Sequence, residues 1–179
     1  MAKAVIVVDM QKGFMAPEGT LFCGDAARQI IPRIRRRVEA ERAAGAEVFF
    51  TQDSHAADDA EFEMFPPHCI AGSAEEEIID ELADLAAEAR LVKKRRYSAF
   101  FDTDLAQTLA VLAPEEVVVM GDCTDICVLH TVAGLRNRDY PVEVPADCVA
   151  SFDEEQHQWA LGHMEKILGA RITNRCADG

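Results

Sequence analysis

Short runs of Val and Ile alternate along this chain with longer stretches in which apolar side chains recur at helical spacing. Most of the short runs are apolar at successive positions, which is typical of strands that are buried on both faces. The runs predict strands at residues 4–8, 47–50, 91–92, 117–120, 142–144 and 171–173. The longer stretches predict helices at roughly residues 26–44, 74–89, 103–112, 125–138 and 154–168.

Local signals indicate where two of these helices begin. Ser73 and Glu76 have the spacing of a capping box, which would start the helix over residues 74–89. Pro32 lies inside the first helical stretch and predicts either a kink or a helix that starts near Ile31.

The alternation of strands and helices implies a parallel sheet with helices on both of its faces. We therefore expect an α/β fold, a three-layer α/β/α sandwich with a central, mostly parallel six-stranded sheet, in a single domain over residues 1–179. The longest stretch without periodicity is residues 53–72, and a loop of that length in a compact domain is usually functional. Ligands of such folds bind beyond the carboxyl ends of the strands, so polar residues there are the candidates.

Composition narrows the classes of partner. The chain has 179 residues, of which 49% are hydrophobic and 28% charged, as in ordinary globular domains. No apolar run approaches the ~20 residues that a membrane-spanning helix needs. The formal net charge is −14, which disfavours nucleic acids and anionic membrane surfaces as partners.

The cysteines indicate a reducing compartment. The chain has six cysteines, but a domain with a core of this size does not need disulfides. The opening Met1-Ala2-Lys3 leads directly into a strand and lacks the features of a secretory signal. We therefore expect mostly reduced thiols and a cytoplasmic location.

Four predicted strands end in residues that can do chemistry, and the topology brings these ends to one edge of the sheet. The residues are Asp9, the pair Asp53 and His55, the pair Lys93 and Lys94, and the pair Cys123 and Cys127. Periodicity over so short a strand does not decide which of the two lysines points inward.

Cys127 has two interpretations. Most free cysteines are small buried apolar residues. This one, however, follows a strand-end loop near the start of a helix, where unpaired N–H groups and a nearby lysine favour a thiolate. Cys123 and Cys127 could also form a redox pair, although their C-x-x-x-C spacing is not the C-x-x-C of thioredoxin-like motifs.

The loop over residues 53–72 carries two histidines and two carboxylates that could bind a metal: Asp53, His55, Glu61 and His68. This mixture of nitrogen and oxygen ligands suits Zn²⁺, and also Mn²⁺ or Fe²⁺. The alternative is a polar loop that holds two histidines by chance. Phe14, Phe65 and Tyr97 lie beside these groups in sequence and could form the walls of a pocket for a flat ring, or could belong to the core.

Several of these segments together resemble the isochorismatase-like cysteine hydrolases. They are Asp9 after an apolar strand, Lys94 followed by residues 95–105, the segment 121–128 (GDCTDICV) and the segment 147–151 (DCVAS). The similarity covers nearly the whole chain. Asp53-x-His55 and Phe65-Pro66-Pro67-His68 are similar to the nicotinamidase branch of that superfamily in particular.

The resemblance implies roles for individual residues. Asp9, Lys94 and Cys127 would be catalytic, and the backbone N–H groups of Cys123 and Cys127 would form an oxyanion hole next to a cis peptide bond between Asp122 and Cys123. The metal ligands would be Asp53, Glu61 and His68, with His55 binding directly or through water. The cofactor would be a divalent metal, with zinc expected before manganese or iron.

The activity implied is the metal-dependent hydrolysis of nicotinamide to nicotinate and ammonia through a cysteine thioester, by a protein that forms homo-oligomers. The alternatives are another amidase of the superfamily, acting on a different small amide or ureido substrate, a redox or metal-binding protein that uses Cys123 and Cys127, and a silent scaffold. The chain departs from the family pattern at Asp122, where relatives usually carry an apolar residue. A carboxylate there would oppose a developing oxyanion unless it points away.

Overall fold

A parallel β-sheet forms the centre of the computed structural model, which describes residues 2–175. Its strands are β1 (Lys3–Val8), β2 (Glu47–Asp53), β3 (Arg90–Lys94), β4 (Glu116–Asp122), β5 (Val142–Pro145), β6 (Val149–Ala150) and β7 (Arg171–Thr173). The order across the sheet is β3-β2-β1-β4-β5-β7, with β6 also paired to β4. The paired strands run parallel throughout.

The six predicted strands are confirmed, and β6 is a seventh that periodicity did not predict. This strand has only two residues, so it carries no readable pattern. It pairs with Gly121 and Asp122, beyond the part of β4 that β5 covers.

The α-helices are α1 (Lys12–Met15), α2 (Asp25–Arg28), α3 (Ile31–Ala43), α4 (Ala83–Ala87), α5 (Leu105–Leu112), α6 (Leu129–Arg136) and α7 (Glu154–Lys166). Shorter turns are η1 (Ala60–Glu63), η2 (Ala74–Glu76), η3 (Asp80–Leu82), η4 (Thr124–Val128) and η5 (Ala146–Cys148). Pro32 lies in the first turn of α3, so the prediction of a helix that starts near Ile31 is confirmed. None of the described helices is long and apolar enough to cross a membrane.

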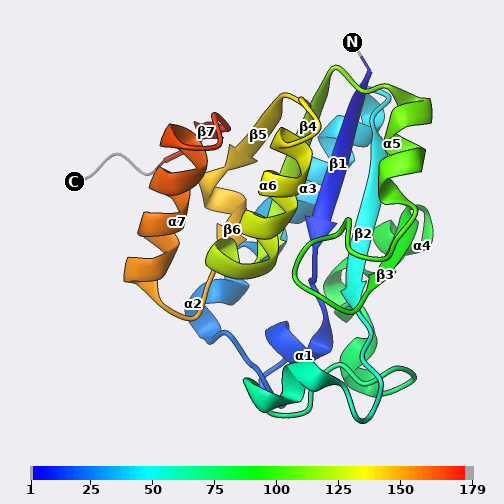
Figure 1. The fold of residues 1–179 in the computed structure, drawn as a ribbon, viewed down its shortest axis with the longest axis vertical. Coiled ribbons are helices and arrows are strands. Elements are labelled where there is room, and N and C mark those ends of the chain that lie inside the picture. The colour runs from blue at the N-terminus through cyan, green and yellow to red at the C-terminus, as the bar shows by residue number, and fades with distance from the viewer. Residues whose placement is uncertain (1, 176–179) are drawn as a thin grey trace.

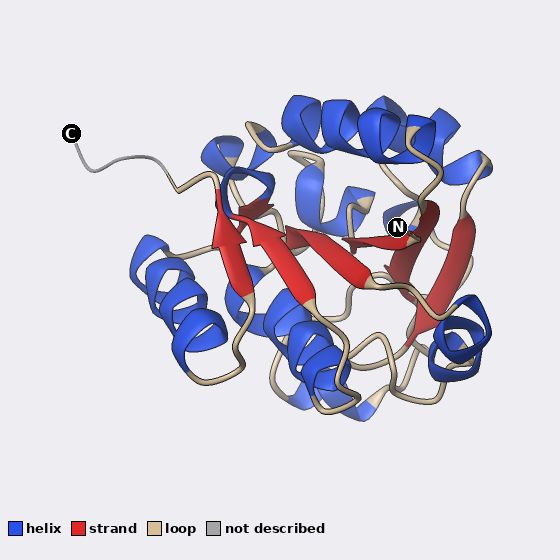
Figure 2. Ribbon diagram, turned by 90° about the horizontal axis from the view of Figure 1, so that it is seen from above, coloured by secondary structure: helices blue, strands red, loops and turns tan. Residues whose placement is uncertain are grey.

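Helices cover both faces of the sheet, which confirms the three-layer sandwich (Figure 2). On one face, Val5 and Val7 of β1 pack in a core with Ile34 and Val38 of α3. The alternate residues of β1 face the other core, which α5, α6 and α7 complete. Because β1 is buried on both faces, its run of successive apolar residues is explained.

The prediction of a single helix over residues 74–89 is wrong. Instead, the segment forms η2, an extended stretch, η3 and α4. The extended stretch bonds to the chain after β1, since the Ile79 N–H donates to the Met10 carbonyl at 3.0 Å. The Ser73 hydroxyl makes no cap, and the Glu76 carboxylate instead accepts from the Gly72 N–H at 2.8 Å and from Lys93 Nζ at 2.7 Å.

The carboxyl ends of the strands point to the lower end of the molecule in Figure 1, where the loop that follows β2 lies. The chain order reverses between β1 and β4, which are neighbours in the sheet but are separated by two strands in sequence. Such a switch point opens a crevice at the strand ends. The predicted catalytic and metal-binding residues belong to these ends or to the loops that follow them.

Candidate active site

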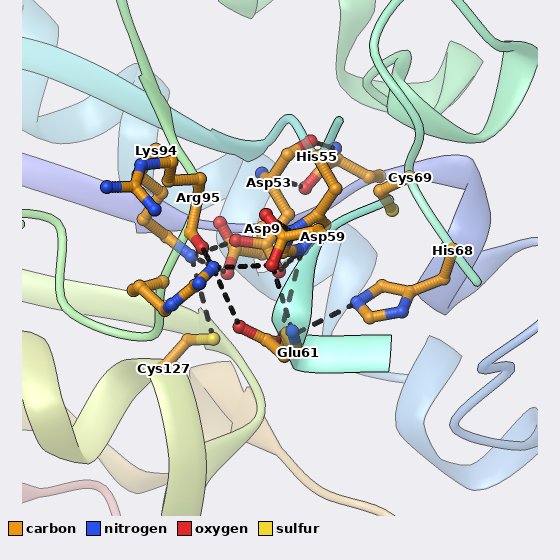
Figure 3. Close-up of polar contacts among 12 residues, drawn as sticks. Asp9, Asp53, His55, Asp59, Glu61, His68, Cys69, Lys94, Arg95 and Cys127 are labelled. Carbon is orange, nitrogen blue, oxygen red and sulfur yellow. Dashed lines mark hydrogen bonds and ion pairs between the residues drawn. The ribbon is translucent and has the colours of Figure 1, made fainter. Parts of the chain in front are cut away.

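A buried lysine joins the acid and the cysteine that the sequence singled out (Figure 3). Lys94 is the last residue of β3, and its Nζ lies 2.7 Å from Asp9 Oδ2 and 3.6 Å from Cys127 Sγ. It also forms an ion pair with Asp53, the last residue of β2. The side chain of Lys94 is 0% exposed, whereas that of Lys93 is 58% exposed, so the structure selects Lys94 as the inward lysine.

Local hydrogen bonds hold Asp9 and Asp53 in place. The Thr51 hydroxyl donates to Asp9 Oδ1 at 2.5 Å and accepts from the Asp9 N–H at 3.1 Å. The side chain of Gln11 donates to the Asp53 carbonyl and accepts from its N–H, at 2.9 and 2.7 Å. Both acids are therefore fixed by buried side chains from neighbouring strand ends.

The charges of this cluster follow from burial and from Lys94. Burial alone would lower the pKa of Lys94, but Asp53 and Asp9 outweigh it and raise the pKa well above its ordinary value. Burial would raise the pKa of Asp53, yet Lys94 brings it below its ordinary value. Burial raises the pKa of Asp9 in spite of Lys94, which makes Asp9 a better proton acceptor than an exposed carboxylate.

The surroundings of Cys127 favour its thiol form. Burial raises its pKa well above the ordinary value, and although Lys94 opposes this, the carboxylates of Asp9 and Asp53 reinforce it. Burial and these carboxylates oppose the thiolate that the helix start and Lys94 would favour. Asp9 and Asp53 are the carboxylates that lie near the sulfur.

The chain between β4 and Cys127 has an unusual backbone. The peptide bond between Asp122 and Cys123 is cis, as the resemblance implied. Gly121 has φ of 118°, and a Cβ there would come within 2.1 Å of the Val8 carbonyl oxygen, so glycine is required where β4 passes β1. Cys127 then lies in η4, a single π-helical turn that leads into α6. Turns of this kind are frequent at functional sites.

The four predicted metal ligands come together. One ligand atom from each of Asp53, His55, Glu61 and His68 lies within 4.8 Å of the other three. All four residues are at most 3% exposed. Clustered buried imidazoles and carboxylates are typical of a site for Zn²⁺ or a related cation.

The hydrogen bonds of this cluster leave atoms free toward its centre. His68 Nδ1 lies 2.9 Å from the Pro66 carbonyl, which can only accept, so Nε2 keeps its lone pair. Among the described residues, His55 Nε2 and Glu61 Oε2 have no hydrogen-bond partner although they are buried. Because unpaired buried polar atoms are costly, these orphaned atoms fit a bound cation.

Two residues that the sequence did not single out, Asp59 and Arg96, support this cluster. Asp59 Oδ2 lies 3.2 Å from His55 Nδ1, and Asp59 Oδ1 lies 2.7 Å from Arg96 Nη1. A carboxylate on the far nitrogen of a histidine orients the ring toward a metal. Asp59 lies four residues after His55, so this spacing was a readable signal.

A cavity of about 350 Å³, counting its open mouth, joins the two groups. Its polar end is formed by Asp9, Asp53, Glu61, His68 and Cys127. Its aromatic walls are Phe14, Phe65, Tyr97 and Phe152. The structure thus places the three predicted aromatic residues at the cavity, and adds Phe152 from the chain before α7. His55 is not among the residues that line the cavity and stands behind the other ligands.

Asp122 and the sulfur of Cys123 point toward a third cysteine. Cys23 Sγ lies 3.2 Å from Asp122 Oδ2 and 3.5 Å from Cys123 Sγ. Burial raises the pKa of Asp122 well above its ordinary value, which favours the neutral form of this carboxyl beside the predicted oxyanion hole. The sulfur in contact with that of Cys123 is thus Cys23, which sequence spacing did not connect to it.

Comparisons with known proteins agree with this geometry. The family model for the isochorismatase domain matches residues 3–175. The crystal structure of nicotinamidase/pyrazinamidase PncA from Bacillus subtilis is 38% identical and covers 97% of this chain and 100% of its own, with a TM-score of 0.92. N-carbamoylsarcosine amidase from Thermoplasma acidophilum is 30% identical over 100% of both chains, with a TM-score of 0.86. Pyrazinamidase of Pyrococcus horikoshii in complex with zinc is 28% identical over 97% of this chain and 99% of its own, with a TM-score of 0.88.

Proposed function

This chain belongs to the isochorismatase family of hydrolases, and we propose that its reaction is the hydrolysis of nicotinamide to nicotinate and ammonia. One observation carries the proposal. Asp53, Glu61 and His68, three members of the metal-binding cluster, line the same aromatic-walled cavity as Cys127. A flat ring whose nitrogen binds a metal and whose carboxamide meets a cysteine suits this arrangement.

Asp53, His55, Glu61 and His68 would hold the cation, with Zn²⁺ expected and Mn²⁺ or Fe²⁺ as alternatives. When bound, the cation would supply a Lewis-acid site for the pyridine nitrogen and so orient the ring. Phe14, Phe65 and Tyr97 would stack on or flank the ring.

Covalent catalysis would then use the buried cluster. Asp9 accepts the thiol proton as Cys127 Sγ attacks the carboxamide carbon, and Lys94 stabilises the negative charge that passes between them. The backbone N–H groups of Cys123 and Cys127 hold the oxyanion, and each such donor is typically worth roughly 2.7–4 kcal/mol. Asp9 returns the proton to the departing ammonia, which leaves a thioester on Cys127. Asp9 finally activates the water that cleaves the thioester and releases the acid.

Ammonia release from nicotinamide tests this function. The reduced, metal-loaded protein should release ammonia, a chelator should abolish the release, and Zn²⁺, Mn²⁺ or Fe²⁺ should restore it. Iodoacetamide should still alkylate Cys127 in the stripped protein, because the cation orients the substrate and does not activate the sulfur. Undiminished turnover in the stripped protein would contradict the role assigned to the metal.

Turnover of a different amide tests the choice of substrate separately from the cysteine chemistry. An N-carbamoyl amino acid serves as the ureido substrate, and nicotinamide should exceed it in kcat/KM. If only the ureido compound releases ammonia, the cysteine chemistry stands and the nicotinamide assignment fails. If neither compound reacts while Cys127 remains alkylatable, the chain is a silent scaffold for both reactions.

A further inference from the structure

Two thiols and a carboxyl group meet beside the active site without belonging to the proposed reaction. We name Cys23, Asp122 and Cys123 the thiol–carboxyl cluster. Cys23 lies in the loop before α2, Asp122 ends β4 and Cys123 follows it. The three residues are 8%, 1% and 5% exposed, respectively. Three potential ligands are therefore buried together, from two segments far apart in sequence.

The distances within the cluster fit the edges of a coordination tetrahedron. With Zn–S of about 2.3 Å and Zn–O of about 2.1 Å, a tetrahedral site has edges of about 3.8 Å between sulfurs and about 3.6 Å between sulfur and oxygen. The structure gives 3.5 Å between Cys23 Sγ and Cys123 Sγ. From Asp122 Oδ2, the distances are 3.2 Å to Cys23 Sγ and 3.9 Å to Cys123 Sγ. Small movements of the three side chains would be enough to close a site.

A second observation points to a ligand. The other carboxyl oxygen, Asp122 Oδ1, is buried and has no hydrogen-bond partner among the described residues. Among the described residues, no lysine or arginine is paired with this carboxyl. Asp122 and Cys123 also line the cavity, so the cluster lies beside it.

We propose that Cys23, Cys123 and Asp122 form a second metal site, which takes a single divalent cation of the Zn²⁺ class through two thiolates and one carboxylate. Its donor set differs from that of the loop site, whose four ligands are histidines and carboxylates. Three protein ligands with a fourth position for water is a common zinc arrangement. Asp122 and Cys123 are adjacent residues, so a bound cation would also fix the side chains that flank the predicted oxyanion hole.

Binding must displace protons. The hydrogen bond with Cys123 lowers the pKa of Cys23, but burial and Asp122 outweigh it and raise the pKa to about 11. Hydrogen bonding to Cys23 and burial raise the pKa of Cys123, and burial raises that of Asp122, both well above their ordinary values. These shifts favour the protonated form of each group, so a cation that binds them must displace protons. Its affinity should rise with pH.

Cobalt(II) distinguishes the two sites because only cysteine ligands give sulfur-to-cobalt charge-transfer absorption. The background is Cys127→Ala, since Cys127 lies near Asp9 and Asp53 and is itself a candidate sulfur ligand. Under reducing conditions this protein should bind two equivalents of Co²⁺, one of them with the charge-transfer band. Adding Cys23→Ala should remove the band and one equivalent.

Two further variants test whether the effect is specific to the thiol–carboxyl cluster. Cys148→Ala removes another buried cysteine and should leave both the band and the second equivalent unchanged. Asp122→Asn should keep the sulfurs but weaken Co²⁺ binding at this site by roughly tenfold or more, because it loses a charged ligand. Circular dichroism checks that each variant is folded.

The proposal fails if the Cys127→Ala protein binds one equivalent without the band, or if the band survives Cys23→Ala. It also fails if the cluster only forms a Cys23–Cys123 disulfide on treatment with peroxide and takes no Co²⁺ when reduced. None of these readouts depends on turnover of nicotinamide, so the proposed function and the second metal site stand or fall separately.

Discussion

Two clusters of cysteine and carboxylate lie at the same edge of the sheet and differ in one kind of side chain. Asp9, Asp53 and Cys127 surround Lys94, whereas no lysine or arginine of the described residues forms an ion pair with Asp122. Burial raises the pKa of Asp9 and of Asp122, but Lys94 brings that of Asp53 below its ordinary value. The fixed ammonium group therefore favours an ionised carboxylate at Asp53, whereas burial favours the neutral form at Asp122.

This ammonium group distinguishes a cluster suited to catalysis from a cluster suited to metal binding. In the first cluster the cation is the ammonium group of Lys94, which holds the proposed base Asp9 and the proposed nucleophile Cys127 around itself. In the thiol–carboxyl cluster, burial favours protons on the same kinds of donor atom, and a bound metal would displace them. Substitutions at matched positions of the two clusters should therefore have very different effects.

Removal of the nucleophile should have the largest effect. Cys127→Ala should reduce nicotinamide turnover by at least about 10⁴-fold, because no thioester can form. Cys123→Ala is the matched substitution in the thiol–carboxyl cluster and should keep kcat within about tenfold, because its proposed contribution is a backbone N–H. Ammonia release measures both. If both variants are equally inactive, the redox pair of Cys123 and Cys127 becomes the better hypothesis.

Removal of the lysine should lower stability. Lys94→Met leaves Asp9 and Asp53 buried without their cation, and breaking a buried pair in this way typically costs about 3–5 kcal/mol. Lys93→Met is the control on the same strand, and loss of its partly exposed ion pair with Glu76 should cost about 0–1 kcal/mol. Urea denaturation gives both free energies of unfolding. Equal losses would show that Lys94 does not hold this cluster together.

Local patterns in the sequence predicted part of the fold and of the site. Successive apolar residues indicated the buried strands, and the strand ends placed Asp9, Cys127 and one of Lys93 and Lys94 at one edge. The helical spacing of apolar residues predicted the wrong structure over residues 74–89, because backbone hydrogen bonds to Met10 and Lys12 hold part of this segment extended. Such long-range pairing has no local signature.

The partners of Asp122 could not be predicted from the sequence. Cys23 lies in a loop 99 residues before Asp122, and no periodicity connects them. The direction in which the Asp122 side chain points depends on tertiary packing around the end of β4. The family resemblance supplied the candidate site residues, but only the structure shows that this carboxyl is buried beside two thiols.

The effect at Asp122 is small per pH unit and concerns the pH dependence of stability, which tests the thiol–carboxyl cluster most directly. The pKa of Asp122 is raised in the folded protein, so above the unfolded value of about 3.9 the folded state holds a proton that the unfolded chain has lost. Wild-type stability should therefore fall relative to Asp122→Asn as the pH rises above about 5, until the pH reaches the raised pKa of the folded state, by at most about 1.4 kcal/mol per pH unit. Urea denaturation of both proteins, with chelator present, gives this difference at each pH.

An exposed aspartate gives the matched comparison. Its hydrogen bond with Arg35 holds the pKa of Asp84 below the ordinary value, so the folded state there favours the charged form. The stability that this carboxylate contributes is present above the unfolded pKa and is lost only as the pH falls through the folded one. The difference between wild type and Asp84→Asn should therefore stay constant over the same pH range in which that for Asp122→Asn changes. If both differences stay constant, Asp122 is ionised in the folded protein, and the two clusters do not differ in charge as the structure indicates.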